Sequence, residues 1–223
     1  MSVDQSTLSA RQEQAASTQR QLLAAAVAVF EEKGYQATTV GAITDRANTA
    51  HGTFYLYFRN KEDAFCQVIE GVVVGELAVD RLGSPAEDPR QAIEESLRNF
   101  VAVYHRHEGL WRALMEGMLA SPRVQQLWLE LRRDLVLQLS AAFEAQQATG
   151  ALRPFAPTLV AHALAAMTEW SAFTYFLLDE PGAAGGRGEP EELVATLSDL
   201  WYRSVYGRVP EDDGRDDQSP DSA

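Results

Sequence analysis

The sequence holds one cysteine, Cys66, among its 223 residues. A single cysteine excludes an internal disulfide framework and any zinc or iron–sulfur site built from several thiolates. Long apolar runs are also missing: the longest uncharged apolar run near the start, residues 22–30, has nine residues, whereas a bilayer-spanning helix needs about 20. The polar segment 1–21 lacks the apolar core of a signal peptide. We therefore expect a cytoplasmic protein that does not associate with membranes.

Basic residues are scarce, and the charge is unevenly distributed. The formal net charge is −13, yet residues 1–61 carry six Lys and Arg against five Asp and Glu, a net charge of +1. The last fourteen residues carry six acids and one arginine. Because an acidic surface repels DNA, only the N-terminal end of the chain is suited to bind it. The charge distribution is compatible with DNA binding and does not establish it.

Strand patterns are absent as well, since no segment alternates apolar and polar residues convincingly over five positions. We predict an all-α fold. Residues 1–16 and 209–223 are expected to be disordered, the second segment as an acidic tail. Between them we predict a small domain at 17–62, extending into a connecting helix at 61–79, and a helical domain at 80–208. Helices are expected at about 18–33, 39–47, 51–57, 61–79, 89–107, 110–119, 123–147, 157–178 and 191–206.

The short helices expected at 39–47 and 51–57 have the spacing of a helix-turn-helix, with a tight turn at Asn48. In such a unit the second helix enters the major groove of DNA, and hydroxyl groups nearby hold phosphates. Phe54 and Phe58 lie four residues apart and can anchor this helix inward. The candidate DNA contacts are Thr39, Val40, Gly41, Thr49, Ala50, His51, Gly52, Thr53, Tyr55, Tyr57 and Lys61.

Several of these candidates have a purely structural alternative. Thr39 is a helix cap whether or not it also touches a phosphate. His51 could be a solvated residue of the first helical turn, and Tyr55 and Tyr57 could be core aromatics. Lys61 lies at a predicted helix start, where backbone amides also favour phosphate oxygens.

The run FEEKGYQATTV at 30–40, Ile43, and the run HGTFYLYFRNKED at 51–63 resemble the DNA-binding domain of the TetR family of bacterial repressors. The resemblance covers about residues 20–74. It implies a homodimer that binds double-stranded operator DNA through an N-terminal three-helix domain. It also implies a C-terminal helical domain that dimerises and binds a small-molecule effector. The family usually has glycine at the turn where this chain has Asn48, and asparagine tolerates the left-handed conformation.

The segment after residue 80 is rich in large apolar side chains, which by default pack in a core. Some could instead line a cavity with apolar walls and a few polar groups. Glu169 interrupts an apolar helix and could lie at an exposed edge, at a dimer interface or in a pocket. The candidate pocket residues are Trp111, Arg112, Met115, Met118, Trp128, Met167, Glu169, Trp170 and Phe173. The candidate interface residues, in an intersubunit four-helix bundle, are Leu164, Ser171, Tyr175, Leu197, Leu200 and Trp201.

These features favour a ligand-responsive repressor that binds a palindromic operator as a dimer and is released by a small, mostly apolar effector. The helix at 61–79 is the only covalent connection between the two domains, so the effector would act by tilting it. One alternative is an unregulated, architectural DNA-binding dimer with a filled core. The other is an enzyme, which is disfavoured because no nucleophile–base grouping occurs. His105 and His107 point to different helix faces, so we expect no metal, no cofactor and no catalytic residue.

Overall fold

The computed structural model describes residues 3–77, 88–178 and 189–207. Every regular element in these ranges is a helix, so the predicted all-α fold is confirmed. The predicted break at 83–85, most of the loop at 181–190 and the acidic tail lie outside the described residues. The helices are α1 (Val3–Ala37), α2 (Val40–Arg46), α3 (His51–Phe54), α4 (Lys61–Glu76), α5 (Pro89–Arg106), α6 (Glu108–Ala120), α7 (Pro122–Ala148), α8 (Pro157–Phe176) and α9 (Pro190–Tyr206).

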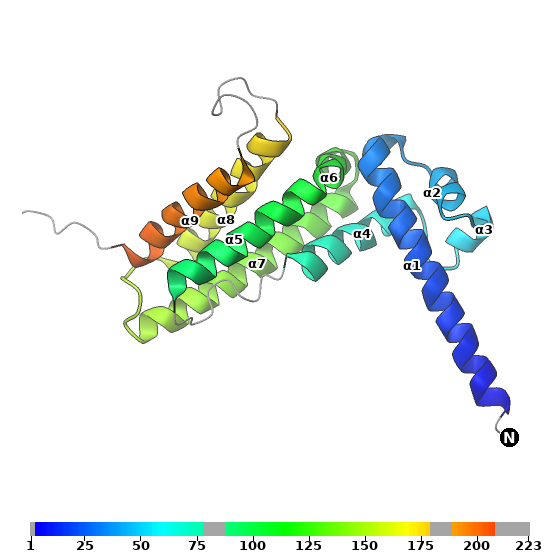
Figure 1. Ribbon diagram of the computed structural model, residues 1–223, viewed down its shortest axis with the longest axis horizontal. Helices are drawn as coiled ribbons and strands as arrows, with labels where there is room; N and C mark the ends of the chain where they lie inside the picture. The colour runs from blue at the N-terminus through cyan, green and yellow to red at the C-terminus, as the bar shows by residue number, and fades with distance from the viewer. Residues whose placement is uncertain (1–2, 78–87, 179–188, 208–223) are drawn as a thin grey trace, which may run out of the picture.

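Helix α1 begins at Val3, so the prediction of a disordered lead-in is wrong for residues 3–16. No glycine or proline occurs before Gly34, and this segment is rich in Ala and Gln, which favour helices. The helix projects beyond α2 and α3 (Figure 1). It is kinked at Gly34, whose φ of 76° and ψ of 177° form a conformation that is essentially restricted to glycine.

The helix-turn-helix forms where the sequence predicts it, with a shorter second helix. The Thr39 side chain accepts a hydrogen bond from the Ala42 backbone N–H, 3.1 Å away, and so caps α2. Asn48 adopts the expected left-handed conformation, with φ at 50°. Helix α3 ends at Phe54 rather than at residue 57. The chain there tightens into i to i+3 hydrogen bonds, such as Tyr57 N–H to the Phe54 carbonyl, and Phe54 and Phe58 are both buried.

Helices α5, α7, α8 and α9 lie side by side, and α4 and α6 lie between them and the helix-turn-helix unit formed by α1–α3 (Figure 1). Among the described residues, α4–α9 make up the six helices expected after Asn60. Asp88 caps α5 and Ser121 caps α7. One apolar cluster joins the helix-turn-helix unit to α4 and α6, and a second joins α5, α7, α8 and α9.

The helix-turn-helix unit is held by α6 as well as by the covalent link through α4. A Cβ atom added at Gly109 of α6 would lie 2.8 Å from the Cα of Glu31 in α1. His107, between α5 and α6, contacts Glu31 at 2.6 Å and Glu76 of α4 at 3.2 Å. Glu116 of α6 accepts a hydrogen bond from the Gln36 backbone N–H, 3.1 Å away. Helices α1 and α6 therefore form a close non-covalent junction between the two parts of the chain.

Candidate nucleic-acid interface and internal cavity

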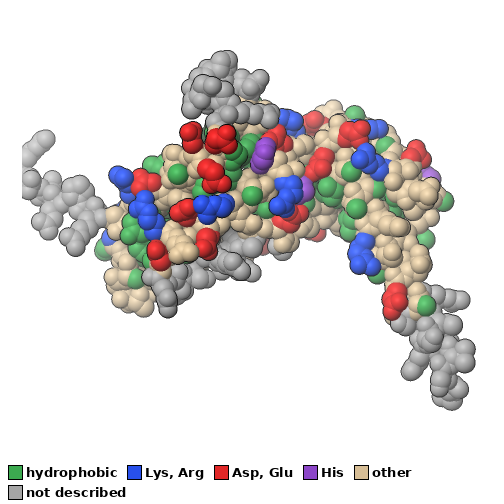
Figure 2. Space-filling view, viewed as in Figure 1, with side chains coloured by type: hydrophobic (Ala, Val, Ile, Leu, Met, Phe, Trp, Pro, Cys, Tyr) green, Lys and Arg blue, Asp and Glu red, His purple; other side chains and the backbone are tan. Residues whose placement is uncertain are grey.

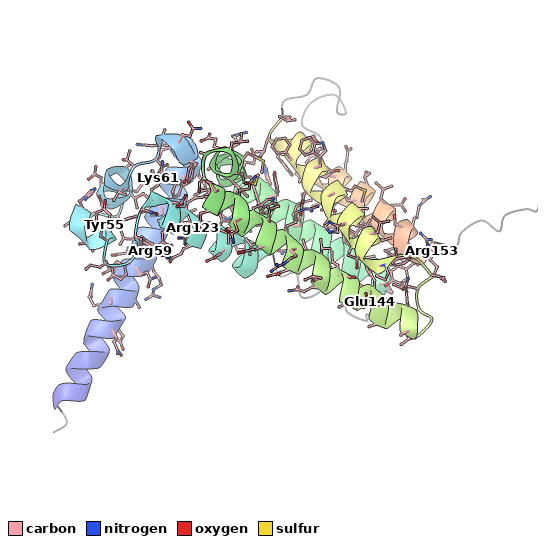
Figure 3. All side chains as sticks on the ribbon, turned by 180° about the vertical axis from the view of Figure 1, so that it is seen from behind. Tyr55, Arg59, Lys61, Arg123, Glu144 and Arg153 are labelled. Carbon is pink, nitrogen blue, oxygen red and sulfur yellow. The ribbon has the colours of Figure 1, made fainter. Side chains whose placement is uncertain are left out.

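The outer face of the helix-turn-helix unit presents side chains of α3 and of the turn after it. His51 and Gly52 are exposed, Tyr55 is 53% exposed, and the His51 and Tyr55 rings lie 5.4 Å apart. Figure 3 shows Tyr55 and Arg59 at this end of the molecule, far from Glu144 and Arg153 at the other end. Because Phe54 and Phe58 are fully buried, they anchor the segment that presents the exposed His51, Gly52 and Tyr55.

The predicted DNA contacts divide into two groups by exposure. Thr39, Ala50, His51, Gly52 and Tyr55 are exposed. The others are half-buried, and the Thr49 hydroxyl is buried without a hydrogen-bond partner. The half-buried members are Val40, Gly41, Thr49, Thr53, Tyr57 and Lys61. Contact of any of them with DNA stays a prediction.

Lys61 has a structural role that the sequence did not reveal. Its ammonium donates hydrogen bonds to the carbonyls of Tyr35 at 2.8 Å and Gln36 at 3.2 Å, and it lies 4.7 Å from the centre of the Tyr35 ring. Burial lowers the pKa of Lys61, and the carboxylate of Glu116 opposes that shift. Since an ammonium has three N–H donors, one remains for a phosphate oxygen. Lys61 thus ties the end of α1 to the start of α4.

Arg59 is an exposed cation near Lys61 and is absent from the predicted DNA contacts. Its guanidinium lies 3.5 Å from the buried Asp63 carboxylate, and Arg123 contacts the same carboxylate at 3.0 Å. Burial opposes ionisation of Asp63, but the Arg59 backbone N–H and both guanidinium groups outweigh it and lower the pKa of Asp63. The signal for Arg59 was its place next to the Tyr-x-Tyr-Phe run.

Elsewhere, acidic and basic side chains are interspersed over the helical bundle (Figure 2).

A cavity of about 740 Å³ lies between α5, α6, α7 and α8. The predicted residues Trp111, Met115, Met118, Trp128, Glu169, Trp170 and Phe173 line it. The prediction is wrong for two others: Arg112 extends outward near Glu108, and Met167 packs against the second apolar cluster. Lining residues that the prediction missed include Phe100, Tyr104, Leu131, Arg132, Leu135 and Trp201. The helical spacing of Phe100 with Tyr104, and of Leu131 with Leu135, was the available signal.

The polar groups of this cavity include an ion pair between α7 and α8. The Arg132 Nε atom donates to Glu169 Oε2 at 2.7 Å. Burial raises the pKa of the Glu169 carboxyl, and Arg132 opposes the shift through its hydrogen bond and charge. The Trp201 indole N–H donates to the Thr168 hydroxyl at 2.8 Å. Of the three positions left open for Glu169, the structure places it in the cavity wall.

Three of the predicted interface residues are already covered within their own subunit. Leu164, Leu197 and Trp201 are at most 4% exposed, because they pack in the cluster between α5, α7, α8 and α9. Ser171 and Tyr175 are half-buried, and Leu200 is 43% exposed. Leu159 and Trp170 on α8 are more exposed than Leu200, and neither was predicted at the interface. Along helices α8 and α9, the exposed large apolar side chains are therefore Leu159, Trp170 and Leu200.

Across the described ranges, none of the helices combines the length and apolar character that spanning a bilayer requires. In the same part of the chain, no three His, Cys, Asp or Glu side chains are grouped so that they could hold a metal ion.

Comparison with known proteins identifies the class of protein. Residues 22–66 match the bacterial regulatory proteins of the tetR family, and residues 93–207 match the C-terminal domain of the transcriptional regulator EthR. The second match alone covers more than half of the chain. The chain therefore belongs to the TetR family of transcriptional regulators. It is a DNA-binding regulator and not an enzyme.

Individual relatives agree with this assignment. The chain is 28% identical over 192 residues to the HTH-type transcriptional regulator EthR of Mycolicibacterium smegmatis, covering 85% of this chain and 86% of that one. It is 27% identical over 194 residues to EthR of Mycobacterium tuberculosis, covering 83% and 86%. A putative TetR-family regulator from Mesorhizobium loti superposes with a TM-score of 0.69 at 21% identity, over 86% of this chain and 98% of that one. This last likeness shows the fold.

Proposed function

We propose that this regulator binds a palindromic operator as a homodimer and is released from it by a small, mostly apolar effector. The observation that carries the proposal is the cavity of about 740 Å³, which is lined mainly by aromatic and aliphatic side chains. Its size is that of a small-molecule site. An architectural DNA-binding dimer with a filled core would have no use for such a cavity.

The DNA contacts are expected at α3, with His51 near base edges and Tyr55, Tyr57 and Lys61 near phosphates. His51→Ala should change sequence preference more than total affinity. Lys61→Ala should weaken binding to every sequence and reduce the salt slope by about one unit, because a phosphate contact carries no base information. Because Lys61 also donates hydrogen bonds to carbonyls at the end of α1, the unfolding curve of the Lys61→Ala variant must be measured together with its DNA affinity. The exposed Arg133 of α7 provides the matched control, Arg133→Ala. Wild-type binding by both test variants would contradict this assignment.

The homodimer is expected to form through α8 and α9, and the exposed Leu200 lies on that surface. Leu200→Glu should give monomers that lose operator binding, because a buried unpaired carboxylate is strongly unfavourable at an interface. Leu129→Glu, at a 58% exposed position of α7, should leave the dimer intact. Substitutions of Leu197 or Trp201 are unsuitable because they would disrupt the core of the subunit. Sedimentation of the wild type as a monomer at micromolar concentration would refute the proposal.

Release from DNA requires that the cavity communicates with the two recognition helices. Helix α6 contributes Trp111, Met115 and Met118 to the cavity and contacts α1 through Gly109. An effector that prefers a shape in which α4 and α6 tilt would hold the recognition helices away from the roughly 34–36 Å separation of successive half-sites. A coupling of about 1–3 kcal/mol is typical. Titration of fatty acyl and aromatic compounds against the protein–operator complex tests this. Release only by a charged, hydrophilic compound would overturn it.

A further inference from the structure

The wall of the cavity contains one close ion pair among otherwise largely apolar surroundings. Arg132 and Glu169 are 22% and 23% exposed, and a single hydrogen bond of 2.7 Å joins them. The third charged residue of the lining, Asp134, faces solvent and lies 3.4 Å from Arg133. The Arg132–Glu169 pair is therefore the charged group that a molecule inside the cavity would meet.

Much of the hydrogen-bonding capacity of this pair is unused. A guanidinium carries five N–H donors and a carboxylate has two acceptor oxygens. Within the described residues, the hydrogen bond from Nε of Arg132 to Oε2 of Glu169 is the one these two side chains make. The Nη groups of Arg132 and the Oε1 atom of Glu169 are left for a ligand, so the pair offers donors and an acceptor side by side.

A second polar group of the lining also lacks a partner. Trp111 is 4% exposed, and its indole N–H is buried with no hydrogen bond. Its ring is fixed, because it stacks on Tyr104 with centroids 4.7 Å apart and meets Trp128 edge-on at 6.1 Å. A buried N–H without an acceptor is unfavourable. Protein atoms cover this N–H, so the polar head of a bound molecule meets the Arg132–Glu169 pair and not Trp111.

We propose that the effector carries an uncharged head, most simply a carboxamide, on an apolar body. This inference rests on the proposed function and specifies the chemistry of its ligand. The carbonyl oxygen accepts hydrogen bonds from the Nη groups of Arg132, and the amide N–H donates to Oε1 of Glu169. The Met and aromatic side chains of the remaining wall pack against the apolar body.

The ion pair is the reason for an uncharged head. A carboxylate would compete with Glu169 for Arg132 and place two negative charges at one guanidinium. An ammonium group would compete with Arg132 for Glu169 in the same way. Either head would separate a pair that is largely removed from water, whereas a carboxamide binds with the pair intact and leaves no unmatched buried charge.

The test compares four ligands with chains of the same length: decanamide, methyl decanoate, decanoate and decylamine. All four tryptophans of the chain line the cavity, so quenching of intrinsic fluorescence measures binding there. Decanamide should bind at least tenfold more tightly than methyl decanoate, which lacks the N–H donor, and more tightly than either charged compound. Equal affinities for decanamide and methyl decanoate would overturn the proposal. If none of the four compounds binds, the effector part of the proposed function fails as well.

Variants test whether the ion pair causes the preference for decanamide over methyl decanoate. Arg132→Met with Glu169→Met removes both charges together, so the amide and the ester should then bind equally, and no more tightly than the ester binds the wild type. Arg133→Met on the exposed side of α7 should keep the tenfold preference. Retention of that preference by the double variant would refute the assignment.

If the double variant does not fold, a single variant tests independently how the charge of Glu169 affects the binding of an anionic ligand. Glu169→Gln removes the carboxylate that repels an anionic head, so decanoate should bind more tightly than it does to the wild type. Unchanged or weaker decanoate binding would contradict a head group at Arg132. Trp111→Phe keeps a ring and removes the covered N–H, and it should leave the tenfold preference for decanamide over methyl decanoate unchanged. Loss of that preference would contradict a head group held by the ion pair alone.

Discussion

Gly109→Ala is expected to force apart the junction between the helix-turn-helix unit and the cavity-bearing helices. The added Cβ would lie 2.8 Å from the Cα and 2.9 Å from the carbonyl carbon of Glu31. Carbon atoms attract best at roughly 3.5–4.0 Å, so α1 and α6 must separate by at least roughly 0.7 Å, and the Glu31 carbonyl oxygen is the nearest atom of all. All three atoms belong to the backbone of Glu31 and cannot rotate away. Relief therefore requires movement of a whole helix.

The magnitude follows from comparison with a second glycine. Overpacking of this kind costs about 1–3 kcal/mol, while alanine in a helix is favoured over glycine by roughly 1 kcal/mol. Gly71 of α4 is exposed, and an added Cβ there meets nothing within 4 Å. Gly71→Ala should therefore show only the stabilisation that alanine gives relative to glycine in a helix. The two variants should differ by about 1–3 kcal/mol in the free energy of unfolding, with Gly109→Ala the less stable.

Urea unfolding followed by circular dichroism measures this difference, and thermal unfolding should show a gap of about 2–4 °C per kcal/mol for a chain of this size. Operator affinity should fall for Gly109→Ala and remain at the wild-type level for Gly71→Ala, because only the first alters how α1 sits on α6. Equal stability of the two variants would refute the close approach of these helices.

Other predictions concern the helix-turn-helix unit. Thr39→Ala should lower the free energy of unfolding by about 1 kcal/mol through loss of the cap on the Ala42 N–H, and Thr39→Ser should retain it in urea unfolding. Asn48→Ala should cost about 1 kcal/mol because of its φ of 50°, whereas Asn48→Gly should cost nothing. Asp63 has a lowered pKa, so it stabilises the fold above its ordinary value of 3.8 and loses that contribution as the pH falls through the folded value. The stability deficit of Asp63→Asn at pH 7 should therefore shrink in acid, and an undiminished deficit at low pH would contradict this.

The helix-turn-helix unit could be predicted from sequence because its signals are local. Thr39 caps the helix that it precedes, Asn48 marks the left-handed turn, and Phe54 and Phe58 mark the buried side within four residues. The end of α3 could not be predicted, since it depends on burying both phenylalanines in the apolar cluster shared with other helices. The bond of Lys61 to the Tyr35 carbonyl joins residues 26 positions apart, and no local pattern indicates it.

The cavity was predicted less well because its wall comes from separate helices. Large residues such as Trp111 and Trp170 can be predicted as cavity residues from their size. Which neighbouring helix they face depends on packing and cannot be predicted in that way. Trp201 has the same apolar character as an interface residue and lies in the cavity wall instead. Arg132 follows the same logic, since it gains its place only from Glu169, 37 positions later. A charged residue in an amphipathic helix gives no sequence signal that it pairs with a residue of another helix in a cavity wall.

Helix α6 shows how one short segment can serve both parts of the chain. Its large side chains, Trp111, Met115 and Met118, line the cavity. Its glycines allow close contact elsewhere: Gly109 touches the backbone of Glu31, and Gly117 packs beside Phe65 and Tyr35. Because protein interiors are densely packed, a ligand that displaces the large side chains cannot be accommodated by compressing the glycine contacts. On the proposed mechanism, the displacement would instead move α1, and with it the helix-turn-helix unit, which would link occupancy of the cavity to the orientation of α3.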